Sequence, residues 1–67
     1  MEELLKERLK NAKEKYKINY TFIANKIGVT RQHLYRWTLP NDNKEHRNLS
    51  SKRITMLDDI LTKIETL

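Results

Sequence analysis

Cysteine is absent from the sequence, and glycine and proline each occur only once in its 67 residues. Without cysteine neither a disulfide nor a thiolate zinc site can support so short a chain, and only His33 and His46 offer imidazole ligands. A domain of this length buries only about 60% of its unfolded surface, which leaves room for one small core and no second domain within residues 1–67. The composition therefore favours a compact helical fold or an oligomer, in a reducing compartment or one where redox state is irrelevant.

Long apolar runs are also missing. No stretch approaches the roughly 18 apolar residues of a membrane span, and the N-terminus Met1-Glu2-Glu3 lacks the basic and then apolar order of a signal peptide. We therefore expect a cytoplasmic protein. An enzyme is not expected, because the sequence has no glycine-rich phosphate loop and no cysteine nucleophile. Asp58 and Asp59 adjoin each other on the polar face of a helix, where they are expected to act as solubilising residues.

Acidic residues are missing from the centre of the chain. Fourteen Lys and Arg against nine Asp and Glu give a net charge of +5, and residues 15–41 contain five of these bases and no acid. The rest of the chain holds nine residues of each sign, so its charges balance. Such a segment points to a polyanionic partner, most commonly nucleic acid, although a short chain can show one by chance.

Apolar spacing predicts a long helix at each end of the chain and no strand. The stripe of the first helix, over residues 2–16, consists of Leu5, Leu9, Ala12 and Tyr16. The last helix begins at Ser50 or Ser51, and its stripe consists of Ile54, Leu57, Leu61 and Ile64. Three apolar residues off this stripe form a second small patch, namely Met56, Ile60 and Leu67.

Two shorter helices are predicted between them. Asn19 is the expected N-cap of the first, and Gly28 ends it because glycine adopts the left-handed conformation without strain. Thr30 is the expected N-cap of the second, which ends before Pro40. The expected buried residues of the pair are Ile23, Ala24, Ile27, Leu34 and Trp37, and residues 39–48 are expected to form a polar loop.

A tight glycine turn between two short helices, the second rich in Arg and Gln, is typical of a helix-turn-helix, here about residues 20–38. The run from Ile18 to Trp37 resembles the helix-turn-helix of phage repressor and Cro proteins and their bacterial XRE-type relatives. Its most specific part is Ile23-Ala24-Asn25-Lys26-Ile27-Gly28-Val29-Thr30-Arg31, and Arg8-Leu9-Lys10 and Asn48-Leu49-Ser50 also fit the family. The resemblance covers nearly the whole chain. It implies a small all-α, lambda-repressor-like domain of four helices, with five helices as the alternative.

The resemblance also implies that the helix at residues 31–38 lies in the major groove of double-stranded DNA. By position, the expected base-reading residues are Arg31, Gln32, Tyr35 and Arg36. Their chemistry suits this role, because Arg pairs bidentately with guanine and Gln with adenine. Phosphate contacts are expected from Tyr20, Thr21, Lys26, Thr30, Asn41, Asn43 and Lys44.

Several residues depart from the family or allow another interpretation. Tyr20 stands where the family often has Gln, and Lys17 stands where many relatives have Gly, so Lys17 is expected to take a positive φ. Tyr35 reads bases, touches phosphate or covers the edge of the core. Phe22 is expected to be partly exposed, packing on the last helix or contributing to a partner surface. The base-reading candidates are alternatively a solvated helix face, Trp37 is expected in the core, and both histidines are expected on the surface.

We therefore expect a sequence-specific transcription regulator, a repressor of phage or mobile-element type, that is associated with the nucleoid and needs no cofactor. Because one helix reads only a few base pairs, a homodimer is expected, at least on DNA, with Met56, Ile60 and Leu67 pairing the last helices. The alternatives are an antirepressor or protein-interaction module on the same fold, and a nonspecific nucleic-acid binder.

Overall fold

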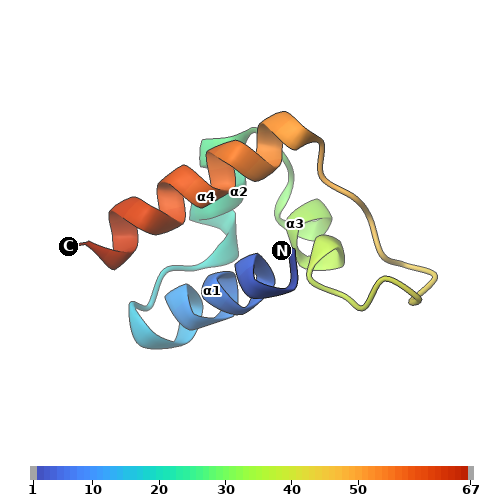
Figure 1. Ribbon diagram of the computed structural model, residues 1–67, viewed down its shortest axis with the longest axis horizontal. Coiled ribbons are helices and arrows are strands. Elements are labelled where there is room, and N and C mark those ends of the chain that lie inside the picture. Colours follow the sequence, from blue (N-terminus) through green and yellow to red (C-terminus); the bar gives the residue numbers. More distant parts are fainter. Residues whose placement is uncertain (1, 67) are drawn as a thin grey trace.

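The computed structural model describes residues 2–66 and contains four helices, with no strand among those residues (Figure 1). The helices are α1 (Glu2–Lys15), α2 (Tyr20–Ile27), α3 (Arg31–Trp37) and α4 (Ser51–Glu65). Helix α4 packs against both α1 and α2, and α2 packs against α3. The segment between α3 and α4 extends away from the helices at one end of the molecule (Figure 1). None of the described helices is long and apolar enough to cross a membrane.

Side-chain caps begin three of the helices, as predicted. The side-chain oxygen of Asn19 accepts a hydrogen bond from the amide of Phe22 at 2.9 Å, and that of Thr30 accepts one from His33 at 3.0 Å. Ser50, rather than Ser51, caps α4 by accepting from the amide of Arg53 at 3.3 Å. Each cap satisfies an amide that has no partner within its own helix, so local sequence fixes where these helices begin.

Two left-handed residues end the first two helices. Gly28 has φ 79° and allows the amide of Val29 to donate to the carbonyl of Ala24 at 3.0 Å. Lys17 has φ 59°, which confirms the positive φ predicted for it, and the amide of Ile18 donates to the carbonyl of Ala12 at 3.2 Å. Both turns follow the pattern by which a left-handed residue closes a helix C-terminus.

A single core joins all four helices. Its largest fully buried side chains are Leu9, Ile23, Ile27, Leu34, Trp37, Leu57 and Leu61. The prediction that Tyr16 belongs to the buried stripe is wrong: α1 ends at Lys15, and Tyr16 is 38% exposed. The chain reverses at Lys17, and Ile18 packs against the core instead.

Three further features of the structure differ from prediction. Helix α3 ends at Trp37 and not at Thr38, whose hydroxyl donates to the carbonyl of Tyr35 at 2.6 Å. Both histidines are partly buried and not fully on the surface, and the Nε2 atom of His33 lies 3.0 Å from the carbonyl oxygen of Asn48. Met56 and Ile60 are also partly buried against the core, and Leu67 lies outside the described residues.

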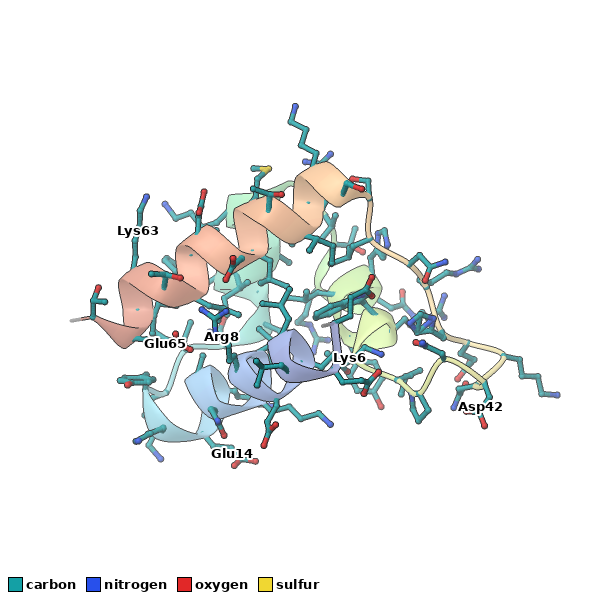
Figure 2. The ribbon with its side chains drawn as sticks, in the orientation of Figure 1. Lys6, Arg8, Glu14, Asp42, Lys63 and Glu65 are labelled. Carbon is teal, nitrogen blue, oxygen red and sulfur yellow. The ribbon has the colours of Figure 1, made fainter. Side chains whose placement is uncertain are left out.

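An ion-pair cluster links α1 to α4. Arg8 lies between the two helices (Figure 2), where its guanidinium donates to Asp58 at 2.6 Å and to Glu65 at 3.0 Å. The hydrogen bonds that Arg8 donates to Glu65 and Asp58 raise its pKa. The prediction that Asp58 is only a solubilising residue is therefore wrong, since it pairs with a base contributed by a distant part of the chain.

Candidate nucleic-acid interface

Helix α3 presents the four predicted base-reading residues. Because Leu34 and Trp37 are fully buried, the opposite side of the helix faces outward. At 3.6 residues per turn, the four predicted residues lie on that outward side, which we call the α3 face: Arg31, Gln32, Tyr35 and Arg36. Arg31, Gln32 and Tyr35 are exposed, whereas Arg36 is partly buried.

Arg47 joins this surface, although it was not among the predicted site residues. With Thr30, Gln32, His33 and Arg36 it lines an open hollow of about 250 Å³. Its amide donates to the carbonyl of Arg36 at 3.4 Å, and the Nε2 atom of His33 lies 3.0 Å from the carbonyl oxygen of Asn48. The segment before α4 thus returns along α3. In the sequence, Arg47 is only a base at the end of a polar loop. That position did not indicate that Arg47 lies beside α3.

Three predicted phosphate contacts lie at helix starts. Thr30 accepts a hydrogen bond from the amide of His33, which leaves the hydroxyl proton of Thr30 free to donate. Tyr20 is partly buried, and the Nζ atom of Lys13 lies 5.0 Å from its ring centroid. Burial, followed by the charges of Glu14 and Tyr35, raises the pKa of Tyr20. Its phenol therefore keeps its proton at neutral pH and can donate a hydrogen bond. Thr21 is exposed beside it.

The remaining predicted phosphate contacts lie outside the hollow. Lys26 lines a different groove, together with residues of α4. In the loop, Asn41 accepts a hydrogen bond from Lys6 at 3.2 Å, and Asn43 accepts one from the amide of Glu45 at 2.8 Å. Lys44 shares a hollow with Asp42 and Glu45, so two carboxylates offset its charge. Asp42 marks this loop tip, far from the helices, in Figure 2.

Lys6 holds the C-terminal end of α3. It is only 4% exposed, and its Nζ atom donates to the carbonyl of Leu39 and to Asn41, both at 3.2 Å. The same atom lies 5.8 Å from the ring centroid of Trp37, whose Nε1 donates to Glu2 at 3.2 Å. Figure 2 shows Lys6 where α1 meets α3 and the following loop. A cation suits this place, because the end of a helix presents unpaired carbonyls.

Arg53 of α4 holds the turn before α3. Its Nη1 atom donates to the carbonyl of Ile27 at 2.6 Å, at the C-terminus of α2. The guanidinium lies so close to Gly28 that a Cβ atom added there would be 2.6 Å from Nη1. Lys6 and Arg53 therefore fix α3 from both ends. Neither role was predictable from the sequence, because an isolated base on an amphipathic helix is normally solvent-exposed.

The chain matches no family model, no curated protein and no solved structure in the comparisons made. The α3 face carries two guanidiniums, an amide and a phenol, and Arg47 adds a third guanidinium beside it. Among the described residues, no carboxylate lines the hollow next to this face. Such a surface suits a polyanion with hydrogen-bonding groups.

Proposed function

We propose that this protein is a sequence-specific DNA-binding transcription regulator in which α2 and α3 form a helix-turn-helix and α3 lies in the major groove. The observation that carries the proposal is the α3 face, which brings Arg and Gln side chains together without an acid. Arg bonds the O6 and N7 atoms of guanine, and Gln bonds the N6 and N7 atoms of adenine. A nonspecific binder needs only positive charge, whereas paired Arg and Gln donors allow sequence to be read.

The dimensions of α3 support this docking. An α-helix with its side chains is about 10 to 12 Å across, and the major groove is about 12 Å wide, so α3 fits within it. In this geometry Arg31, Gln32 and Arg36 read base edges, with Tyr35 beside them. Arg47, Thr30 and Tyr20 contact the backbone from the flanks. Arg47, the one base assigned to a phosphate, then contributes about −0.9 per subunit to the salt slope, the change in log K with log salt.

Two copies on neighbouring half-sites would supply the specificity that one helix lacks. Half-sites lie about 34 Å apart when they are separated by one turn of DNA. The longest dimension of the described chain is 35 Å, so copies on successive turns are within reach of each other. We further propose that the protein acts as a repressor of phage or mobile-element type in the cytoplasm, without catalysis or a cofactor, as the family resemblance implies.

Selection of bound sites from a random DNA pool, followed by substitution, tests this function. On the selected site, Arg36→Ala should cost about 1 to 3 kcal/mol of binding free energy, with little change on random DNA. Arg47→Ala should weaken binding to both DNAs alike and reduce the salt slope by about one. Lys52→Ala, an exposed base on α4, serves as the matched control and should change neither quantity.

Two outcomes would contradict the proposal. An equal loss on selected and random DNA for Arg36→Ala would make the protein a nonspecific nucleic-acid binder. Failure to enrich any site, with no measurable salt-dependent binding, would favour a protein-interaction module or antirepressor on the same fold.

A further inference from the structure

An apolar groove with a basic rim lies between α2 and α4. It measures about 270 Å³ and is lined by Phe22, Lys26, Ile60, Lys63 and Ile64, which we call the basic groove. Phe22 is 46% exposed, and the Nζ atom of Lys26 lies 5.4 Å from its ring centroid. Lys63 points away from the body of the molecule (Figure 2). Among the described residues, no carboxylate lines this groove.

A complementary feature lies at the start of α1. Leu4 is 63% exposed, more than any other large apolar side chain in the part of the chain that the structure describes. Glu3 and Glu7 flank it and are exposed, and we call these three residues the acidic knob. The nearby Lys6 is buried, and its Nζ atom lies 3.4 Å from Glu3, the longest of its three bonds, so it offsets this carboxylate only in part. The knob therefore pairs an apolar side chain with two carboxylates.

We propose that the acidic knob of one copy docks in the basic groove of a second copy. The two surfaces match in chemistry, because Leu4 meets the apolar floor while Glu3 and Glu7 meet Lys26 and Lys63. The groove is large enough to accept the side chain of Leu4, since a cavity of about 150 Å³ already holds a benzene ring. A symmetric pairing of two grooves or of two knobs would instead oppose like charges.

The two surfaces lie on opposite sides of α4. The hollow beside the knob involves Ile54, Thr55 and Asp58, whereas the groove involves Ile60, Lys63 and Ile64. Because the two surfaces face opposite sides, the contact is head-to-tail: a pair of copies keeps one free knob and one free groove, and the assembly does not close at a dimer.

The contact is expected to be weak. A few residues on each side bury much less than the roughly 1,200 Å² of a standard stable interface, so association is transient. It becomes important when another ligand brings two copies together and raises their effective concentration. No residue of the α3 face takes part, so this proposal does not depend on DNA binding.

Sedimentation equilibrium of the free protein, measured up to about 1 mM where the weakest specific contacts become populated, tests the proposal with two charge reversals. The first is K26E/K63E, which makes the groove acidic. The second is E3K/E7K, which makes the knob basic. Glu3 bonds Lys6 at 3.4 Å, the longest of the three bonds that Lys6 makes, so its loss leaves the other two in place.

Wild-type protein should show an average mass that rises with concentration past twice the 8.1 kDa monomer. Each variant alone opposes like charges, and its dissociation constant should rise more than about tenfold. An equimolar mixture of the two variants should associate again, because every knob then meets a groove of opposite charge. K15E/K44E, which reverses two exposed lysines outside both surfaces, should behave as wild type.

The other outcomes overturn the proposal. If the protein paired groove to groove, E3K/E7K would still associate with itself. If it paired knob to knob, K26E/K63E would still associate with itself. Either dimer would stop at twice the monomer mass. Wild-type protein that stays at the monomer mass throughout also overturns it. If circular dichroism shows that E3K/E7K is unfolded, Leu4→Ala replaces it. Leu4→Ala should associate more weakly than wild type without any change in net charge. Unchanged association would refute docking of the knob.

Discussion

Replacing Gly28 with alanine tests how α4 holds the turn before α3. Gly28 has φ 79°, and this left-handed conformation costs an L-residue about 1 to 2 kcal/mol. The new methyl group would also lie 2.6 Å from the Nη1 atom of Arg53, so the guanidinium must move. Its 2.6 Å bond to the carbonyl of Ile27 is then lost, at about 1.5 to 3 kcal/mol for a charged hydrogen bond. The expected loss of unfolding free energy is about 2.5 to 5 kcal/mol.

A double-mutant cycle separates the two causes. Arg53→Met removes the guanidinium first, so in that background Gly28→Ala should cost only the conformational strain of about 1 to 2 kcal/mol. The coupling energy between the two substitutions should therefore be about 1.5 to 3 kcal/mol. Lys52→Met, at the exposed neighbouring position on α4, should couple to Gly28→Ala by less than about 0.5 kcal/mol.

Urea unfolding followed by the fluorescence of Trp37, the single tryptophan, measures all the variants of the cycle. The denaturant slopes should stay equal, which shows that only stability has changed. Additive effects of Gly28→Ala and Arg53→Met would refute the reasoning, because they would mean that Arg53 does not occupy the space beside the glycine.

Two further predictions concern the core and the start of α2. Trp37→Ala should lose about 3 to 5 kcal/mol, a large part of the roughly 3 to 10 kcal/mol expected for a domain of this length, whereas Trp37→Phe should lose less. Thermal unfolding followed by circular dichroism checks this, and an unchanged midpoint for Trp37→Ala would show that the ring is not in the core. Because the pKa of Tyr20 is raised, the folded state holds the phenol proton more tightly than the unfolded chain does. The contribution of Tyr20 to stability is therefore constant below about pH 10, the pKa of an unfolded tyrosine, and it falls above that pH. Tyr20→Phe should therefore gain stability relative to wild type as pH rises from about 9 to 11. Tyr16→Phe, at an exposed position, is the control. Parallel curves of stability against pH for wild type and Tyr20→Phe would contradict this prediction.

The helix boundaries could be predicted because their causes are local. Asn19, Thr30 and Ser50 each bond an amide three positions ahead, and Gly28 and Lys17 each close the helix just before them. A sequence window of a few residues contains both partners of these interactions. The α3 face was predictable for a similar reason, since burying Leu34 and Trp37 on one side of a short helix leaves the other side outward.

The hydrogen bonds by which three bases join the helices, two of them supporting α3, were not predictable because their partners are distant in sequence. Lys6 bonds Leu39, Arg8 bonds Asp58 and Glu65, and Arg53 bonds Ile27. Helical periodicity placed the three bases beside or outside the apolar stripes, where charged side chains usually meet solvent. Which carbonyl or carboxylate faces each of them depends on how the helices pack. Periodicity within one helix contains no information about that packing.

The acid-free stretch and the basic surface beside α3 overlap only in part. Lys26 belongs to the stretch, yet it lines the groove between α2 and α4. Arg47 lies outside the stretch, yet it joins Gln32 and Arg36 at the α3 hollow. If position along the chain determined the role of a base, losing Lys26 would weaken DNA binding more than losing Arg47. The two proposed surfaces predict the reverse: Arg47→Ala should lower DNA affinity and the salt slope, and Lys26→Ala should weaken association between copies. Lys26→Ala and Arg47→Ala each remove one positive charge, and the two charges lie on different surfaces. Comparing these variants in the DNA-binding and the sedimentation assays therefore separates the two proposed surfaces.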